Sequence, residues 1–128
     1  MKKEIFIIDD DPIYAFIVSK MINRIDSSLV INQCENGKVG LTKLEYLRNS
    51  SHKIVVFLDL NMPILDGWEF LEEIEKCNFY NLHQLIIYIV SSSTDQRDKL
   101  KAKQFGFVRG FFHKPLFSED IKKIIEID

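Results

Sequence analysis

Five short apolar runs separated by longer amphipathic segments constrain the fold of this chain more than any other feature. The runs are rich in Ile, Val and Phe and lie at residues 4–8, 29–33, 54–58, 85–90 and 110–112. They are apolar at consecutive positions, which is typical of strands buried on both faces of a parallel sheet. Strict alternation of such strands with helices predicts an α/β fold: a doubly wound, five-stranded parallel sheet with five helices.

The segments between the runs predict the helices. Asp11 and Pro12 are suited to the cap and the first turn of a helix. Steps of three and four residues along this helix mark Ile13, Phe16, Ile17, Lys20, Met21 and Ile25. Further helices are expected after Gly37, after Gly67, from Thr94 or Asp95 to before Gly106, and from Ser118, which we expect to be a cap.

Length, charge and cysteine content narrow the class of protein. The 128 residues fit a single domain, 1–128. The net charge of -2 favours neither a nucleic acid nor a membrane surface as partner, and the apolar run at 85–90 is too short to cross a bilayer. Cys34 and Cys77 are isolated, without metal-ligand spacing, and fit a reducing compartment. We therefore predict a cytoplasmic location.

Polar residues stand where four of the predicted strands end. Asp9 and Asp10 follow the first, Asp59 the third, Ser91 the fourth and Lys114 the fifth. Ligands bind beyond the carboxyl ends of the strands in a doubly wound sheet, so these side chains should converge. Clustered carboxylates repel one another unless a cation is present, and Mg²⁺ suits two or three carboxylates with a carbonyl. A carboxylate beside a metal, a lysine and a hydroxyl is equipped to accept a phosphoryl group.

Each of these residues also has a simpler interpretation. Asp9 and Asp10 could favour the positive end of the first helix, although capping needs only one acid, and Asp11 fits that role. Asp59 alone could be a turn residue, and Lys114 a solvated lysine at a strand end. Only the convergence of four strand ends favours the functional interpretation.

Four segments carry a resemblance to a known family. In this order, "FIIDDDP", "FLDLNMPILDG", "IVSSS" and "GFFHKPL" resemble the receiver domains of bacterial response regulators, over essentially the whole chain. The resemblance implies a flavodoxin-like fold with strand order 2-1-3-4-5. It also implies two-component signalling, in which a sensor histidine kinase or a histidine phosphotransfer protein donates a phosphoryl group.

The resemblance assigns roles to individual residues. Asp59 would be the phosphoacceptor, and Mg²⁺ would be bound by Asp9, Asp10, Asp59 and the backbone carbonyl of Asn61. Ser91 and Lys114 would bind the phosphoryl group, and Ser91 and Phe111 would form the switch. The domain would catalyse its own phosphorylation and dephosphorylation without being an enzyme for other substrates.

Three positions depart from the family pattern, and none removes a catalytic group. Ser91 stands where Thr is commoner, Phe111 where Tyr is frequent, and Ser92 where Ala is frequent. On sequence alone, Phe111 is more simply a residue at the edge of the core.

The expected output is contact with a protein partner, because the last predicted helix ends close to residue 128. The contact surface would be formed by the helix that begins near Asp95, the strand 110–112 and the final helix. That surface could also support a weak dimer of an otherwise monomeric protein. Relay of the phosphoryl group to a histidine phosphotransfer protein is equally open.

Three rival functions lack a residue that they need. A phosphohydrolase of the haloacid-dehalogenase type also uses an Asp nucleophile at a strand end, but needs a second Asp where Asn61 stands. A Ca²⁺ loop starting at Asp59 would need glycine at Ile64 and glutamate at Phe70. A flavin-binding module would need a phosphate-binding loop, and no glycine-rich segment is present. Slowly decaying stoichiometric labelling would favour the receiver, whereas steady ester hydrolysis would favour the phosphohydrolase.

Overall fold

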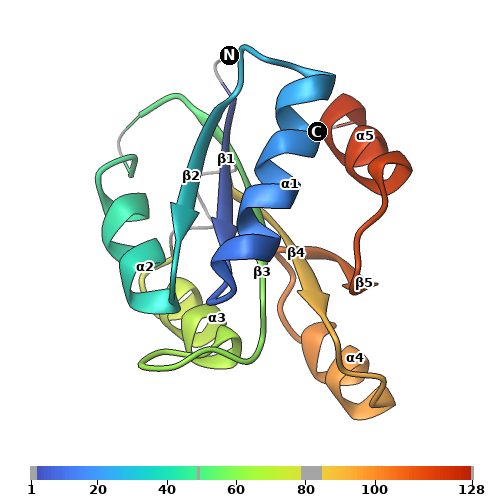
Figure 1. Ribbon diagram of the computed structural model, residues 1–128. Helices are drawn as coiled ribbons and strands as arrows, with labels where there is room; N and C mark the ends of the chain where they lie inside the picture. The colour runs from blue at the N-terminus through green and yellow to red at the C-terminus, as the bar shows by residue number, and fades with distance from the viewer. Residues whose placement is uncertain (1–2, 49, 79–84, 128) are drawn as a thin grey trace.

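The computed structural model describes residues 3–48, 50–78 and 85–127 and contains the alternating strands and helices that the sequence predicts (Figure 1). The strands are β1 (Lys3–Ile8), β2 (Val30–Cys34), β3 (Lys53–Leu58), β4 (Leu85–Ser91) and β5 (Val108–His113). The helices are α1 (Pro12–Ile25), α2 (Gly37–Glu45), α3 (Gly67–Lys76), α4 (Gln96–Ala102) and α5 (Ser118–Ile127).

The strands form one parallel sheet in the order β2-β1-β3-β4-β5, which confirms the predicted doubly wound, flavodoxin-like arrangement. Helices α1 and α5 cover one face of the sheet, and α2, α3 and α4 lie on the other (Figure 1). The chain leaves β1 for β2 on one side and returns to β3 on the other. The order of the strands therefore reverses between β1 and β3, and their carboxyl ends meet where this architecture binds ligands.

Strand β3 shows why the apolar runs are unbroken. Ile54, Val56 and Leu58 belong to the core beneath α2 and α3, whereas Val55 and Phe57 belong to the core beneath α1 and α5. All five side chains are at most 3% exposed. Each such side chain contributes about 1.5–3 kcal/mol when it leaves water. A strand covered on both sides must therefore be apolar at every position.

The buried face of α1 differs from the sequence prediction. Three residues of the predicted apolar face are exposed: Ile13 (72%), Phe16 (52%) and Ile17 (50%). The helix instead buries Ala15, Val18 and Ile22 against the sheet. The prediction was wrong for these three residues because α1 carries two apolar stripes with helical spacing, whereas Met21 and Ile25 do pack against the core. The stripe with the smaller side chains, Ala15 and Val18, lets the helix approach the sheet more closely.

The starts of α4 and α5 also refine the prediction. Asp95 rather than Thr94 caps α4, since its side chain accepts a hydrogen bond from the Arg97 N–H at 2.9 Å. Ser118 is the first residue of α5 rather than its cap. The preceding carbonyl, that of Phe117, accepts hydrogen bonds from the Asp120 and Ile121 amides at 3.0 and 3.2 Å.

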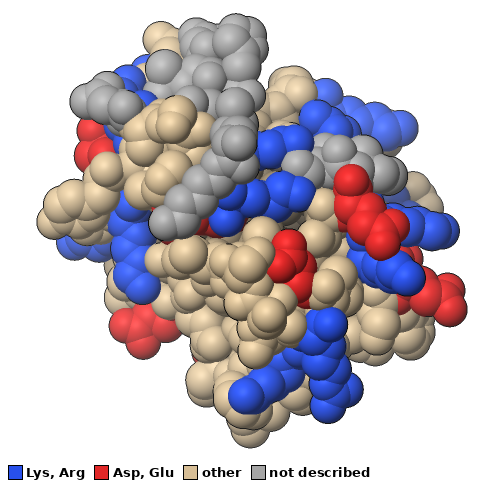
Figure 2. Space-filling view, turned by 90° about the horizontal axis from the view of Figure 1, so that it is seen from above, with Lys and Arg blue, Asp and Glu red and all other residues tan. Residues whose placement is uncertain are grey.

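The end of the molecule at the top of Figure 1 lies at the amino ends of the strands. Viewed from that side, lysine and arginine side chains are interspersed with acidic ones (Figure 2). Among the residues that the structure describes, no helix is long and apolar enough to span a bilayer.

Candidate functional site

Backbone hydrogen bonds place Asp9 and Asp59 side by side beyond the ends of β1 and β3. The Asp9 N–H donates to the Cys34 carbonyl of β2, and the Asp59 N–H donates to the Ile8 carbonyl of β1, both at 2.9 Å. Both residues are buried, at 5% and 6% exposure. One carboxylate oxygen from each of Asp9, Asp10 and Asp59 lies within 4.8 Å of the others. The structure thus brings these three predicted carboxylates together.

The three consecutive aspartates divide into two roles. Asp11 caps α1, because its Oδ1 accepts hydrogen bonds from the Ile13 and Tyr14 amides at 3.0 and 3.1 Å. Asp9 instead faces the cluster, and its Oδ1 accepts a hydrogen bond from the Asp11 N–H at 2.9 Å. Asp10 is exposed and still lies close enough to share a cation with Asp9 and Asp59. Capping therefore accounts for Asp11 alone.

The loop after Asp59 is held by two glycines at helix starts. The Gly67 N–H donates to the Leu60 carbonyl at 2.9 Å, and the Gly37 N–H donates to the Leu65 carbonyl at 3.1 Å. A Cβ at Gly67 would lie 2.5 Å from the Asp59 carbonyl oxygen, which leaves no room for any other residue. Within the loop, Ile64 adopts a φ of 71°, an unfavourable value for a β-branched residue. These contacts show that the loop is ordered and is not simply a turn.

Lys114 supplies a positive charge at the edge of the cluster. Its backbone N–H donates to the Ser91 carbonyl at 2.8 Å, which continues the pairing of β4 and β5. Its Nζ lies 2.8 Å from Asp9 Oδ2 and 3.7 Å from Asp59 Oδ2. Burial acts to lower the pKa of Lys114, but Asp9 and Asp59 outweigh it and raise that pKa. The side chain therefore remains an ammonium ion.

The electrostatics of Asp59 describe a carboxylate whose charge a bound cation would stabilise. Burial, followed by the nearby Asp9 carboxylate, raises the pKa of Asp59 from 3.8 to about 6. Lys114 and the Asn61 backbone N–H act in the opposite direction without cancelling these effects. Oxygen donors that repel one another in a buried cluster suit a hard divalent cation such as Mg²⁺. The residues present thus fit the metal that the sequence predicts.

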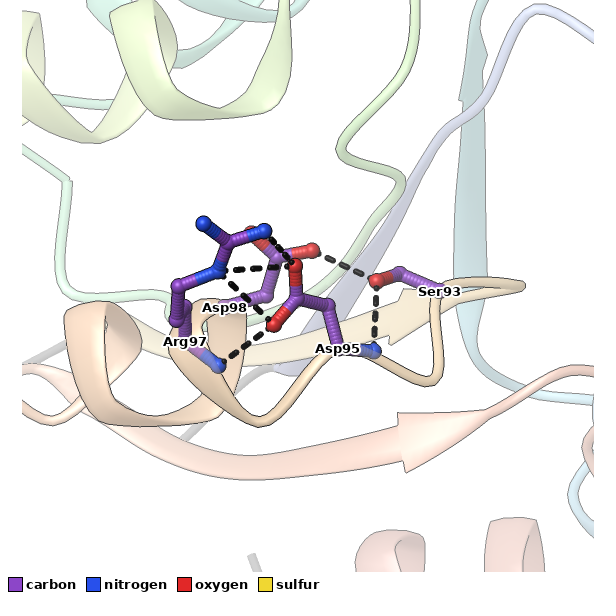
Figure 3. Close-up of polar contacts among 4 residues, drawn as sticks. All are labelled: Ser93, Asp95, Arg97 and Asp98. Carbon is purple, nitrogen blue, oxygen red and sulfur yellow. Dashed lines mark hydrogen bonds and ion pairs between the residues drawn. The ribbon is translucent and has the colours of Figure 1, made fainter.

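Ser91 lies fully buried at the end of β4 and is held by the loop that follows it. Its Oγ accepts a hydrogen bond from the Ser93 N–H at 3.0 Å. The Ser93 hydroxyl in turn donates to Asp98 at 2.6 Å and accepts from the Asp95 N–H at 3.2 Å (Figure 3). Arg97 completes this network with a 2.7 Å contact to Asp95 (Figure 3). The loop therefore fixes the position of the Ser91 hydroxyl.

The other two predicted residues are Asn61, in the loop after β3, and Phe111, on β5. Asn61 is exposed in the loop after Asp59. Phe111 is partly buried against the core and borders a pocket of about 240 Å³ between α4 and β5. Whether the Asn61 carbonyl binds the metal and whether Phe111 moves remain predictions.

The sequence analysis missed Tyr14, whose ring lies beneath the Lys114 ammonium, with 4.5 Å between Nζ and the ring centroid. The Tyr14 hydroxyl is buried and has no hydrogen-bond partner among the described residues. Burial raises the pKa of Tyr14. The backbone of Leu116 lies near the hydroxyl and partly opposes this rise in pKa, although the two groups do not meet the geometry of a hydrogen bond. The sequence shows only a tyrosine in the first turn of a helix that starts at the aspartate cluster, which does not identify the side chain that its ring contacts.

A parallel α/β sheet with an acidic cluster and a lysine at its carboxyl edge defines a class of phosphoryl-accepting domains. A family comparison agrees: residues 5–126 match the response regulator receiver domain. The chain belongs to this family, and Asp9, Asp10 and Asp59 form the acidic phosphorylation site of a two-component receiver.

Individual relatives are similar at low sequence identity. A probable methanogenesis regulatory protein, FilR2 of Methanothrix harundinacea, is 26% identical over 95% of this chain and 78% of the relative. A protein-glutamate methylesterase/protein-glutamine glutaminase of Koribacter versatilis is 34% identical over 80% of this chain, which spans only 26% of that relative. The crystal structure of a two component response regulator from Cytophaga hutchinsonii has a TM-score of 0.86 at 25% identity, covering 99% of this chain and 97% of the other.

Proposed function

We propose that the Asp59 carboxylate accepts a phosphoryl group from a phosphohistidine, in a reaction that requires Mg²⁺. The observation that carries this proposal is the position of Asp59: buried at the end of β3, beside two further carboxylates and 3.7 Å from the Lys114 ammonium. The donor would be a sensor histidine kinase or a histidine phosphotransfer protein.

The transfer forms one bond and breaks one. A carboxylate oxygen of Asp59 attacks phosphorus, and the P–N bond to the donor histidine breaks, with its electron pair returning to the imidazole. Asp9, Asp10, Asp59 and the Asn61 carbonyl would hold Mg²⁺. The cation would supply positive charge that offsets the negative charge of the phosphoryl oxygens. The Lys114 ammonium and the Ser91 hydroxyl would bind two phosphoryl oxygens.

The product is expected to be an acyl phosphate that decays slowly. Asn61 stands where a hydrolase would have a second carboxyl group, so this position supplies no general base to activate water. The domain thus catalyses its own phosphorylation and dephosphorylation and does not turn over a separate substrate. Ser91 would turn from the Ser93 amide toward the phosphoryl group, and Phe111 would move inward with it.

The signal is expected to pass to a protein partner in the cytoplasm, from residues 1–128 acting as a single domain. The proposed contact surface consists of α4, β5 and α5, where Leu100 is 62% exposed beside the pocket that Phe111 borders. The same surface would support a weak dimer of a protein that is otherwise a monomer.

Acetyl phosphate tests the proposal without a cognate kinase. Wild type incubated with acetyl phosphate and Mg²⁺ should gain one phosphoryl group by intact-protein mass spectrometry, and none when a chelator replaces Mg²⁺. Asp59→Asn should gain none, because an amide cannot form an acyl phosphate. Undiminished labelling of that variant would refute the assignment, and steady hydrolysis of phosphate esters would favour a phosphohydrolase.

A further inference from the structure

The Lys114 ammonium contacts the ring of Tyr14 as well as two carboxylates. The Lys114 ammonium has Asp9 at 2.8 Å, Asp59 at 3.7 Å and the centre of the Tyr14 ring at 4.5 Å. An ammonium within about 6 Å of an aromatic centroid is attracted to the ring face. The three contacts come from the end of β1, the end of β3 and the first turn of α1. Lys114 is therefore confined by three separate elements.

A lysine needs such confinement to act at a defined point. Its side chain is a flexible four-carbon stem that loses rotamer entropy when it is fixed. Attraction to Asp9 alone would draw the ammonium away from Asp59, because Asp9 is the nearer carboxylate. The Tyr14 ring is a third contact, which attracts the ammonium independently of the two carboxylates.

The Tyr14 ring, rather than its hydroxyl, makes this contact. The hydroxyl is buried without a hydrogen-bond partner among the described residues, so it does not anchor the side chain. Phenylalanine should therefore replace Tyr14 without loss of the contact to Lys114.

We propose that Tyr14 is a positioning residue for phosphoryl transfer, whose ring holds the Lys114 ammonium where a phosphoryl oxygen on Asp59 must bind. The proposal rests on the proposed function of the site. Tyr14 acts through Lys114 and does not itself contact the reacting atoms. Its substitution should therefore change the rate of phosphorylation only while Lys114 is present.

The first experiment measures the rate at which acetyl phosphate labels the protein in saturating Mg²⁺. Tyr14→Leu removes the ring and should slow labelling about three- to tenfold, the range expected for a partly buried cation–π contact. Tyr14→Phe keeps the ring and should restore the rate. Phe16→Leu is the matched control, because Phe16 also lies beneath a lysine, Lys20 at 5.3 Å, but on the exposed side of α1. A Tyr14→Leu rate equal to that of wild type would overturn the proposal.

A double-mutant cycle separates positioning from general packing. The affinity for beryllofluoride, a phosphoryl mimic, is measured with Mg²⁺ by NMR titration of wild type, Tyr14→Leu, Lys114→Ala and the double variant. Tyr14→Leu should weaken binding severalfold in wild type and leave it unchanged in the Lys114→Ala background. An equal loss in both backgrounds would mean that Tyr14 only supports the fold, and would refute the proposal.

A third measurement does not depend on phosphorylation. The Lys114 Hε protons should show an upfield ring-current shift in metal-free wild type and Tyr14→Phe, and lose it in Tyr14→Leu. If wild type is not labelled at all, the proposed function fails, while this shift still shows whether the ring holds Lys114. The absence of the shift in wild type would refute the positioning role itself.

Discussion

The Lys114 ammonium lies 2.8 Å from Asp9 and 3.7 Å from Asp59, so in the metal-free protein it pairs more closely with the predicted metal ligand than with the phosphoacceptor. Both carboxylates are buried, and the lysine and a divalent cation would offset the same negative charge. Metal binding must therefore compete with this ion pair.

Mg²⁺ affinity should respond in opposite directions to two substitutions. Lys114→Ala removes the competing cation and should tighten Mg²⁺ binding severalfold, since nearby unit charges interact strongly at a partly buried site. Asp10→Ala removes a ligand and should weaken binding. Isothermal titration calorimetry at neutral pH measures both constants. Weaker binding by Lys114→Ala would show that the lysine does not compete with the metal.

The stability of the metal-free protein should fall as the pH rises from about 4 to about 6. Folding raises the pKa of Asp59 from 3.8 to about 6, mainly through burial and the Asp9 charge. The folded protein then holds a proton that the unfolded chain releases, and this stabilisation is lost as the pH rises through the folded value. In chelator, the Tm of wild type should drop from about pH 4 to about pH 6 more than that of Asp59→Asn. Equal slopes in the two proteins would contradict the raised pKa.

Gly67 should be intolerant of even one added carbon. Gly67→Ala would place a Cβ 2.5 Å from the Asp59 carbonyl oxygen and should destabilise the fold by about 1–3 kcal/mol. Gly106→Ala is the control, because a Cβ there meets nothing within 4 Å. Urea denaturation compares the two free energies of unfolding. A Gly67→Ala protein as stable as Gly106→Ala would mean that the Asp59 loop is not packed against α3 in this way.

The Ser91 hydroxyl should transmit the state of the site to Phe111. Ser91→Ala removes the group that accepts the Ser93 N–H at 3.0 Å and that would turn toward the phosphoryl group. The variant should still bind beryllofluoride with Mg²⁺, while the amide shifts around Phe111 become smaller than in wild type. Shifts of equal size in the two proteins would show that Phe111 does not respond through Ser91.

The sheet and the carboxylate cluster could be predicted from the sequence, because the apolar runs mark the strands and the cluster lies where those strands end. Consecutive apolar residues such as those at 54–58 indicate burial on two faces, and the residue after each run must then lie at the ligand-binding edge. The buried face of α1 was not predictable in this way, because the four-residue step from Ile13 to Ile17 and the three-residue step from Ala15 to Val18 both fit one face of a helix. The face with the smaller side chains, Ala15 and Val18, packs against the sheet, and this preference arises from tertiary packing.

Tyr14 and the Ser93 network could not be found from spacing for a different reason. The contact between Tyr14 and Lys114 joins opposite ends of the chain, and no local pattern records which ring lies beneath which ammonium. Ser93 lies next to Ser91 and Ser92 in a polar segment, where any hydroxyl could have made the bond to Asp98. The sequence shows which side chains could form these contacts, and only the fold shows which of them do.

Mapping the modified residue tests the central claim, phosphorylation of Asp59, most directly. Borohydride reduces the acyl phosphate of an aspartate to homoserine, so wild type treated with acetyl phosphate and Mg²⁺ is reduced, digested and sequenced by tandem mass spectrometry. Homoserine should appear at position 59 and at no other aspartate, and should be absent when a chelator replaces Mg²⁺. Homoserine at Asp9 or Asp10, or a labelled protein with position 59 unmodified, would contradict the account.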